Sequence, residues 1–337
     1  MNIATGDGAR RPPAGTPIRS SSEGFEEVTM CPLCRSQDLV PLFSARDELH
    51  SLPGKWSVHS CRSCSLMFTS PRPTAEAMPC YYPASYQPFG APHAPKDHRP
   101  VMATLKGLAR RFLDPKEHVL PRNVTPGKAL EVGCGSGRFL AQLADSGWQV
   151  EGLEPSAETA VRLRETTGLP VTIGSVNEAS FKSESFDLVV ALMVLEHLHE
   201  PLEDLREIHS WLRTGGVLTG SVPNCASWEF RFFGASWYAL QVPTHLFHFT
   251  PRTLILLLIK AGFTDIRIYH QRNVNNLMVH VGRFLQRHRI PGSRTCLEDP
   301  IRGPAPLRYA LRPVASVLAW LGQAGRISFT ARKGTNR

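Results

Sequence analysis

A glycine-rich stretch at residues 128–140, KALEVGCGSGRFL, constrains the fold more than any other part of the chain. Its first half is a short apolar run that predicts a buried strand, and its second half has the apolar spacing of a helix. Between them stand Gly133, Gly135 and Gly137. Glycine tolerates positive φ and lets the backbone approach a ligand that a Cβ would block. Because a helix N-terminus also presents free N–H groups, this strand, turn and helix predict the opening of a nucleotide-binding βα unit.

The glycine spacing differs from the G-x-G-x-x-G of dinucleotide-binding folds, because Arg138 stands where the third glycine would be. An acid, Glu131, precedes the first glycine by two residues. The resulting E-x-G-x-G-x-G resembles motif I of the class I S-adenosylmethionine (SAM) methyltransferases. The resemblance implies that the turn, with Cys134, holds the methionyl end of SAM and that the acid lies beneath it. A glycine-rich loop without a ligand is the alternative, since short motifs give false positives.

Apolar runs and helical patterns alternate from residue 127 onward, which predicts a parallel sheet with helices on both faces. We expect strands at 128–133, 149–154, 171–173, 186–193, 217–222, 265–269 and 326–332. We expect helices at about 138–146, from 155 onward, at 201–212, and after Thr250-Pro251, an N-cap followed by proline. The resemblance implies an α/β, Rossmann-like seven-stranded sheet whose seventh strand lies antiparallel between the fifth and the sixth.

Length and composition fit one α/β domain with a small accessory module. The chain has 337 residues, 42% hydrophobic and 20% charged, which is typical of globular proteins. Its apolar runs are far shorter than the roughly 20 residues of a membrane span. The N-terminus has no apolar signal-peptide segment, so we expect a cytoplasmic protein. In that compartment structural disulfides are rare, which leaves the eight cysteines for other uses.

The net charge of +9 is unevenly distributed along the chain. Residues 126–250 hold 8 basic and 15 acidic side chains, whereas residues 252–337 hold 15 basic and 3 acidic ones. Such asymmetry predicts an anionic partner near the C-terminal third. A solvated basic face is the alternative.

Two C-x2-C pairs stand near the N-terminus, separated by strand-like segments. They are Cys31 with Cys34, and Cys61 with Cys64. This spacing is typical of a zinc ribbon, in which four thiolates complete a tetrahedral site. Because no position is left for water, such a zinc is structural. Free cysteines, a disulfide pair or a rubredoxin-like iron remain alternatives.

Residues 71–73, P-R-P, and residues 81–86, Y-Y-P-A-S-Y, follow the second cysteine pair. A zinc ribbon and these segments before a SAM domain resemble a bacterial group of class I methyltransferases that act on small molecules and glycans. That group is similar to ubiquinone O-methyltransferase-like enzymes and to nucleotide-sugar C-methyltransferases. We expect the aromatic side chains to pack between the ribbon and the core.

These features divide the chain into six segments. We expect disorder over 1–27, zinc ribbon and aromatic connector over 28–86, a linker with a helix near 102–113 over 87–126, the SAM-binding core over 127–273, a basic helical insertion over 274–325, and the final strand and tail over 326–337.

Further cofactor contacts are expected after the second, third and fourth strands. An acid at the end of the second strand, Glu154, accepts hydrogen bonds from a ribose diol in nucleotide folds of this topology, and the resemblance makes it the SAM ribose ligand, beside Pro155. A helix N-cap charge is the alternative. After the third strand, Ser175-Val176 replaces the family's Asp-Ala, so a backbone N–H, that of Val176 or of Asn177, is expected at the adenine in place of an acid side chain. Leu192 and Met193 are expected to flank the adenine or the sulfonium.

Two segments offer candidate bases. The fourth strand is followed by Leu-Glu-His-Leu rather than the Asn/Asp-Pro-Pro-Tyr of nucleic-acid amino-methyltransferases, and it holds His197. Residues 243–250, PTHLFHFT, hold His245 and His248, of which we expect one to face the pocket. Each histidine has a structural role as its alternative. The aromatic side chains just before them line an acceptor pocket or pack in the core: Trp228, Phe230, Phe232, Phe233, Trp237 and Tyr238.

The sequence therefore predicts a SAM-dependent methyltransferase with structural zinc, and O-methylation of a small-molecule or glycan acceptor is favoured. C-methylation of a nucleotide sugar is one alternative. Another is a protein that binds nucleic acid or an anionic surface on a degenerate methyltransferase core.

The basic insertion over 274–325 shows two amphipathic patterns. One helical face is formed by Leu307, Leu311, Val314, Leu318 and Leu321. Pro313 interrupts this run, and we expect it to start a new helix. Leu277, Val281 and Phe284 form a second stripe, with Arg283, Arg287 and Arg289 largely off it. We expect two helices with arginine-rich outer faces that form a lid beside an anionic acceptor. A peripheral membrane contact is the alternative.

Overall fold

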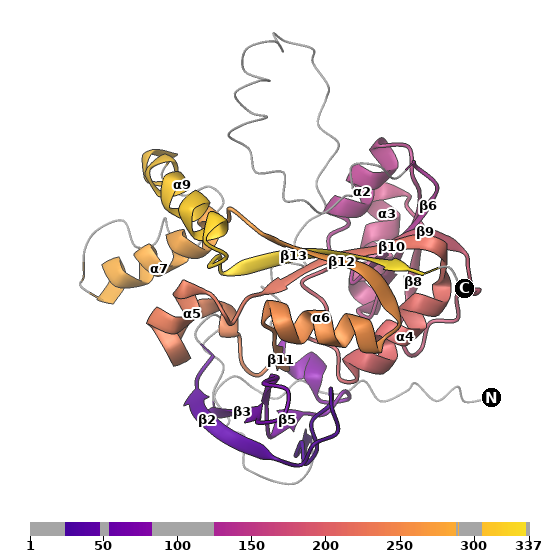
Figure 1. Cartoon of the computed structure of the whole chain (residues 1–337). Helices are drawn as coiled ribbons and strands as arrows, with labels where there is room; N and C mark the ends of the chain where they lie inside the picture. Colours follow the sequence, from indigo (N-terminus) through magenta and orange to yellow (C-terminus); the bar gives the residue numbers. More distant parts are fainter. Residues whose placement is uncertain (1–23, 48–53, 83–124, 288, 290–304, 335–337) are drawn as a thin grey trace, which may run out of the picture.

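The computed structural model describes residues 24–47, 54–82, 125–287, 289 and 305–334. Its centre is a seven-stranded sheet in the order β12-β13-β10-β9-β6-β7-β8 (Figure 1). The strands are β6 Lys128–Val132, β7 Gln149–Glu154, β8 Val171–Ile173, β9 Phe186–Leu192, β10 Leu212–Pro223, β12 Phe263–His270 and β13 Arg326–Lys333. Strand β13 pairs antiparallel with both β10 and β12. The predicted Rossmann-like sheet with an antiparallel seventh strand is confirmed.

Side chains of the central strands point in turn to the two faces of this sheet, and both faces are buried. On one face Ala129 and Leu188 pack with Leu143 of helix α2, Arg138–Asp145. Helix α3, Ala157–Thr167, lies in a neighbouring cluster with Cys134 and Val171. The other face buries side chains such as Leu130 against α4, Pro201–Trp211, and α6, Pro251–Lys260. Figure 1 shows α4 and α6 between the sheet and the N-terminal module.

The helix starts follow the capping chemistry of the sequence. The Ser156 side chain accepts a hydrogen bond from Thr159 N and begins α3. Thr250 and Thr253 form a reciprocal capping box before Pro251, which opens α6. These caps satisfy backbone N–H groups that a helix leaves without partners. The expected starts after residue 155 and after Thr250 are therefore confirmed.

The N-terminal module is a small sheet that the core completes. Strands β2 Leu39–Ala45, β3 Trp56–Cys61 and β4 Met67–Thr69 pair in sequence, and β11 Phe247–His248 adds the fourth strand. A second pair joins β1 Phe25–Glu26 to β5 Arg72–Pro73, followed by the 3-10 helix η1, Met78–Tyr81. Ribbon side chains and side chains of α4 and α6 share one hydrophobic cluster. The ribbon is thus fused to the core through both its backbone and its side chains.

Several expectations are corrected by the structure. Residues 25–26 form β1, although we expected disorder through residue 27. Strand β10 begins at Leu212, where we expected the last residue of a helix, and it includes an irregular stretch before the expected strand start at residue 217. The expected helix near 102–113 lies outside the described residues.

The insertion folds as α7, Val274–Arg287, and α9, Ala305–Trp320. Pro313 stands inside α9 and does not start a new helix. The two helices pack through their own small cluster, in which Met278 and Ala315 are buried. Three short elements follow β10 and precede β11 in sequence: α5 Trp228–Phe233, η3 Gly234–Ser236 and η4 Tyr238–Leu240.

Candidate functional site

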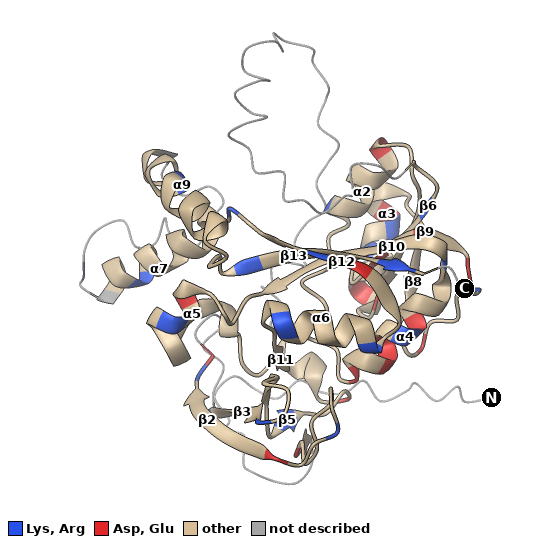
Figure 2. Cartoon of the chain, in the orientation of Figure 1, with Lys and Arg blue, Asp and Glu red and all other residues tan. Residues whose placement is uncertain are grey.

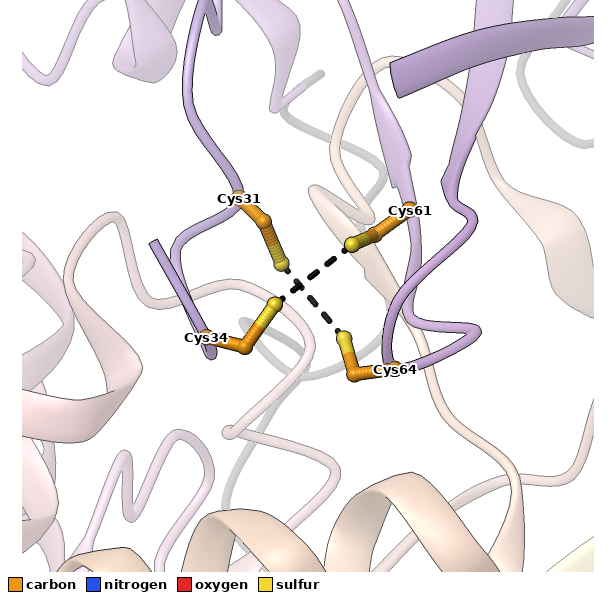
Figure 3. A group of neighbouring side chains, drawn as sticks. All are labelled: Cys31, Cys34, Cys61 and Cys64. Carbon is orange, nitrogen blue, oxygen red and sulfur yellow. Dashed lines mark hydrogen bonds between the residues drawn. The ribbon is translucent and has the colours of Figure 1, made fainter. Parts of the chain in front are cut away.

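The four cysteines of the ribbon converge on one point (Figure 3). Their sulfur atoms all lie within 4.8 Å of one another. Cys31 Sγ lies 3.5 Å from Cys64 Sγ, and Cys34 Sγ lies 3.5 Å from Cys61 Sγ. Zinc–thiolate bonds of about 2.3 Å place the sulfurs of a tetrahedron about 3.8 Å apart. The predicted grouping of the four side chains is confirmed, and its geometry fits a tetrahedral metal ion.

The two C-x2-C segments have the same backbone geometry. The carbonyl oxygen of Cys31 accepts from Arg35 N at 2.9 Å, and that of Cys61 accepts from Ser65 N at 2.8 Å. Arg35 and Ser65 both have a φ of 65°. Each segment is therefore one turn closed at its fourth residue, which aims both thiols to the same side.

The thiols differ in their electrostatic surroundings. Burial raises the pKa of Cys31 to about 11. The pKa of Cys61 falls to about 7, because backbone N–H groups and the Cys34 thiol stabilise its thiolate more than burial opposes it. A dication favours deprotonation of all four thiols, so these residues would hold zinc as a closed structural site.

The glycine turn lies at the carboxyl end of β6, where all three glycines have positive φ. A Cβ on Gly133 would lie 2.8 Å from Cγ2 of Val194, and one on Gly137 would meet the Leu163 side chain. These two positions therefore need glycine for packing against the protein itself. The turn is held in place from below, since Gly133 N donates to Leu153 O at 2.7 Å.

Glu154 ends β7 beside this turn and is 3% exposed. Its carboxylate accepts from Gly135 N at 2.9 Å and from Ser156 N at 3.0 Å. Burial raises the pKa of this group, and the two backbone N–H donors partly oppose the rise. One carboxylate thus connects the turn to the start of α3, and it stands at the edge where a ribose would lie in folds of this topology.

Glu131 lies in β6, two residues before the turn, and is 4% exposed. Its carboxylate accepts from the backbone N–H of Leu140, while burial and the nearby Glu154 raise its pKa to about 8. The same burial raises the pKa of the Cys134 thiol well above its usual range. Both groups are therefore largely uncharged at neutral pH and support the turn from the interior.

The remaining cofactor candidates stand at the same edge of the sheet. Pro155 follows β7, Val176 is buried after β8, and Leu192 ends β9. Met193 has a φ of 55° and donates its N–H to Ser221 O at 2.8 Å. Because β6, β7, β8 and β9 run parallel, their carboxyl ends meet at one edge. The structure therefore brings the predicted cofactor residues together at this edge.

A second cluster joins the two histidine segments. The rings of His197 and His245 lie 4.6 Å apart between centroids and nearly perpendicular. Glu196 joins them, with one ligating atom of each residue within 4.8 Å of the others. The Glu196 side chain is fully buried, and neither of its carboxylate oxygens has a hydrogen-bond partner among the described residues.

Both imidazoles are oriented by backbone carbonyls. His197 Nδ1 lies 2.9 Å from Thr244 O, and His245 Nδ1 lies 3.0 Å from Ala239 O. Since a carbonyl only accepts, each Nδ1 carries the proton, and each Nε2 holds a free lone pair. The two rings therefore present unprotonated nitrogens of the kind a general base uses.

Burial keeps this cluster uncharged at neutral pH. It lowers the pKa of His197 to about 4 and that of His245 well below its usual range. It raises the pKa of Glu196 to about 8. The three groups also meet the distance condition for a metal site, since one ligating atom of each lies within 4.8 Å of the others.

The ribbon contributes a side chain to this cluster. Tyr82, just after η1, places its hydroxyl 3.0 Å from His197 Nδ1. Tyr81 instead packs its ring against Trp56 and Phe25, as expected for an aromatic connector. The sequence interpretation missed Tyr82 as a functional candidate, and the paired tyrosines of the Y-Y-P segment were the signal available.

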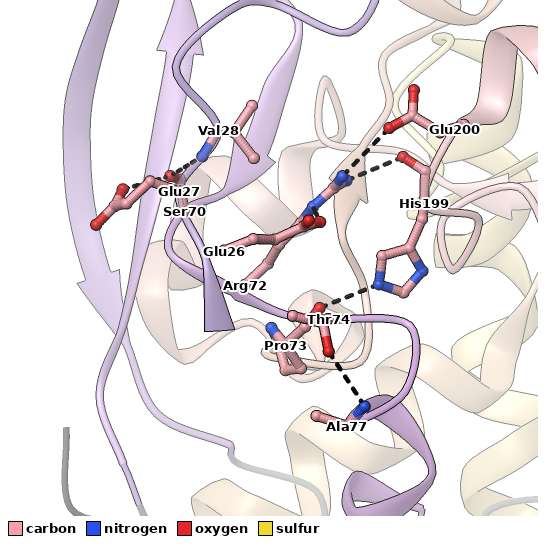
Figure 4. A network of polar contacts seen from close by, with 10 residues as sticks. All are labelled: Glu26, Glu27, Val28, Ser70, Arg72, Pro73, Thr74, Ala77, His199 and Glu200. Carbon is pink, nitrogen blue, oxygen red and sulfur yellow. Dashed lines mark hydrogen bonds and ion pairs between the residues drawn. The ribbon is translucent and has the colours of Figure 1, made fainter. Parts of the chain in front are cut away.

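Arg72 fastens the ribbon to the loop after β9 (Figure 4). The buried guanidinium donates to Glu26 at 2.6 Å and to His199 O at 3.0 Å, and it lies 3.6 Å from Glu200. His199 in turn donates to Pro73 O at 3.0 Å. These contacts fix residues 196–200 against the N-terminal module, and sequence patterns alone did not indicate them.

His248 and the aromatic side chains have divided roles. His248 Nε2 lies 3.2 Å from Thr69 Oγ1 of the ribbon, so His248 joins two modules rather than facing the cluster. Trp237 is buried, whereas Trp228 and Phe232 are exposed and stack with 5.1 Å between centroids. Phe233 stacks on His280 of α7 at 3.7 Å. The aromatic group therefore does not line a single pocket.

Known proteins resemble the core of this chain. Residues 105–268 match the family described as "Methyltransferase domain". A ubiquinone biosynthesis O-methyltransferase of Xanthomonas campestris is 30% identical over 142 residues, which cover 40% of this chain and 59% of that protein. A tRNA U34 carboxymethyltransferase of Desulfotalea psychrophila is 28% identical over 154 residues, 42% of this chain and 47% of the relative.

Among solved structures, a SAM-dependent methyltransferase from Archaeoglobus fulgidus aligns with a TM-score of 0.43 and 17% identity, over 68% of this chain and 92% of that one. The chain spans only about half to three fifths of the two curated relatives. Residues 105–268 of this chain are therefore similar to the methyltransferase domain family.

Proposed function

We propose that this protein transfers a methyl group from SAM to a small-molecule or glycan acceptor, with O-methylation favoured. The observation that carries the proposal is the contact of Glu154 with Gly135 N at 2.9 Å, in a glycine turn at the carboxyl edge of a methyltransferase sheet. In this position a carboxylate with free lone pairs meets a ribose while the turn approaches the rest of the cofactor. SAM, when bound, supplies an electrophilic methyl group.

The chain's residues divide this task between two clusters. The residues proposed to hold the cofactor lie in or after strands β6, β7, β8 and β9: Glu131, Gly133, Cys134, Gly135, Gly137, Glu154, Pro155, Val176, Leu192 and Met193. His245 is proposed as the base, and His197 and Tyr82 as the groups that position it. Methyl transfer is an in-line displacement, so the main contribution of the protein is to orient the acceptor.

The low pKa of His245 narrows the class of acceptor. A buried imidazole of this kind is unprotonated at neutral pH, but it holds an accepted proton weakly. It would therefore not ionise an ordinary alcohol before the reaction. It suits a hydroxyl that is already acidic, such as a phenol or enol, or one whose proton leaves as the methyl group arrives. The names of the ubiquinone O-methyltransferase relatives support oxygen as the methylated atom.

Calorimetry with SAM tests the cofactor assignment. We expect binding by wild type and a loss of roughly 1.5–3 kcal/mol in Glu154→Ala, because charged hydrogen bonds are removed. Gly135→Arg should abolish binding, since a long side chain would occupy the turn. Glu158→Ala is the matched control, because Glu158 lies exposed in the first turn of the same helix. Equal SAM affinity in Glu154→Ala and Glu158→Ala would refute the assignment.

Methyl transfer itself is tested with SAM that carries a 13C-labelled methyl group. Wild type is incubated with a panel of phenols, enols, glycans and nucleotide sugars, and the chemical shift of the labelled carbon distinguishes O-CH3 from C-CH3 products. Labelled C-methyl sugar would favour the alternative reaction. Affinity for nucleic acid together with no affinity for SAM would favour a binding protein on a degenerate core.

A further inference from the structure

Helix α9 presents a continuous apolar stripe on its outer side. The exposed residues Pro306, Tyr309, Ala310, Pro313, Val314, Val317, Trp320 and Leu321 recur every three or four positions. At 3.6 residues per turn they share one face over the length of the helix, which is about 24 Å for 16 residues. Trp320 is 84% exposed and Tyr309 61% exposed. Large exposed apolar patches of this kind mark contact surfaces.

The stripe is separate from the face that holds α9 in the protein. Leu307, Leu311 and Leu318 pack toward Met278 and Ala315 in the cluster with α7. Val314 and Leu321, which we expected on the same face as these leucines, are instead exposed. The helix thus has two apolar faces, one for α7 and one directed outward. The expected arginine-rich outer face of this helix is corrected.

The charge around the stripe is of one sign. The described parts of the insertion, 274–287 and 305–325, contain Arg283, Arg287, Arg308 and Arg312 and no aspartate or glutamate. Figure 2 shows blue but no red residues on α7 and α9, whereas acidic residues gather around α4. Arg312 lies beside the stripe, with its guanidinium 4.6 Å from the ring centre of Tyr309.

We infer that the outer face of α9 binds an anionic lipid surface, with the helix lying parallel to the membrane plane. Tyrosine and tryptophan near the two ends of the stripe suit the boundary between headgroups and acyl chains. Arg312, which lies beside the stripe, supplies attraction to anionic headgroups. No helix in the described part of the chain is long and apolar enough to span a bilayer, so the contact is peripheral. This inference extends beyond the proposed methyl transfer.

The surface also connects to the candidate site. Helix α7, on which α9 packs, holds Asn276, whose side chain accepts from the Tyr238 hydroxyl at 2.8 Å. Tyr238 begins η4, and Ala239 in that turn orients the His245 ring. Arg283 of α7 donates to Ser236 O at 3.1 Å. A membrane-bound α9 would therefore place the site close to a lipid-embedded acceptor.

Co-sedimentation of the full chain with vesicles tests the inference. Vesicles of phosphatidylcholine alone are compared with vesicles that contain phosphatidylglycerol. We expect wild type to bind the anionic vesicles more strongly, and salt to weaken this binding. The triple variant Val317→Ser/Trp320→Ser/Leu321→Ser should lose at least tenfold in affinity. Trp320→Phe should retain most of the binding, because it keeps an aromatic side chain.

The matched control is Ile259→Ser, which removes an aliphatic side chain that is 56% exposed on α6, away from the stripe. It should bind vesicles as wild type does. All substituted side chains are exposed, so thermal melting should be unchanged, and SAM binding reports separately on the core. Wild type that fails to bind anionic vesicles, or a triple variant that binds equally well, would overturn the inference. A wild-type dimer that the triple variant converts to monomer would instead assign the stripe to a second copy of the chain.

Discussion

Two additions to the methyltransferase core differ in how they are attached. The N-terminal ribbon shares a hydrophobic cluster with α4 and α6, takes its fourth strand from the core and is tied by the buried Arg72. The α7–α9 insertion packs mainly through a cluster of its own and leaves an apolar face exposed. The ribbon is therefore a structural part of the site, whereas the insertion offers a surface to something outside it.

Disruption of the four-cysteine site is the strongest test of this difference. We expect Cys61→Ser/Cys64→Ser to lose bound zinc and to destabilise the loops at residues 196–200 and 243–249 together with the ribbon. Structural zinc sites contribute roughly 10–16 kcal/mol of apparent binding free energy to folding. Elemental analysis and thermal melting measure the two effects. Cys80→Ser, at an exposed free cysteine, is the control. Equal metal in both variants would contradict the zinc assignment.

Arg72 tests the polar half of the same attachment. Arg72→Met should lower the free energy of unfolding by about 3 kcal/mol, because the buried guanidinium loses charge-assisted hydrogen bonds. The exposure of Glu26 and Glu200 keeps the expected cost below that of a wholly buried pair. Arg206→Met is the control, since Arg206 pairs with Glu203 at the surface. A cost as small as that of Arg206→Met would show that Arg72 adds little to the apolar contacts and backbone pairing that hold the ribbon.

Met278 tests the independence of the insertion. Its side chain is fully buried in the α7–α9 cluster, so Met278→Ala should cost roughly 2–5 kcal/mol locally. Hydrogen exchange should rise in α7 and α9 while β2, β3 and β4 keep their protection. Leu66→Ala, at a buried residue of the ribbon, should increase exchange in ribbon and core together. If hydrogen exchange increased over both the ribbon and the insertion in each variant, the two additions would not differ in how they are attached to the core.

The sequence predicted those parts of the fold and of the candidate sites that local sequence patterns specify. The succession of strands and helices, the starts of α3 and α6 and the grouping of four cysteines follow from periodicity, caps and spacing. The place of the seventh strand in the sheet was implied by the resemblance to methyltransferases. The contact of Tyr82 with His197 joins residues 115 positions apart, and no local pattern specifies it. Pro313 did not end α9, because packing on α7 outweighs the local preference of proline. Tertiary contacts thus decided what the sequence alone could not.

Two buried acids, one beside each addition, differ in their hydrogen bonds. Glu196 has no hydrogen-bond partner among the described residues, whereas Glu229, beside α7, accepts from Trp237 Nε1 at 3.4 Å. Burial raises the folded-state pKa of Glu196 from 4.5 to about 8. Between pH 4.5 and about pH 8, Glu196 therefore keeps its proton in the native state and has lost it in the unfolded state. This group should therefore lower the free energy of unfolding by up to about 1.4 kcal/mol per pH unit as pH rises.

Chemical denaturation between pH 5 and pH 9 measures this slope. Glu196→Gln should flatten the dependence and stabilise the protein at pH 9 relative to wild type. Glu229→Gln is the comparison, and it should destabilise the protein near neutral pH because an amide replaces one oxygen acceptor in a bonded network. An unchanged slope in Glu196→Gln would mean that this carboxyl is not protonated in the native state.

The smallest expected effect concerns Tyr82, where the ribbon touches the candidate base cluster. The His197 Nδ1–H is shared between two acceptors, Thr244 O and the Tyr82 hydroxyl. Tyr82→Phe removes the hydroxyl and leaves Thr244 O as the acceptor. The free energy of unfolding should fall by no more than about 1 kcal/mol. Nitrogen-15 NMR of the histidine rings should nevertheless show a changed His197 Nδ1–H signal. Tyr81→Phe, at a ring that packs on Trp56, should leave that signal unchanged.

The same pair of variants separates a positioning role from a merely structural one. With an acceptor from the labelled-methyl screen, Tyr82→Phe should lower kcat a few-fold while SAM affinity stays as in wild type. The fall is expected because His197 lies against His245, and a less constrained His197 ring loosens the orientation of the proposed base. If Tyr82→Phe and Tyr81→Phe gave the same kcat, the ribbon would serve only as a scaffold, and its attachment would differ from that of the insertion in strength alone.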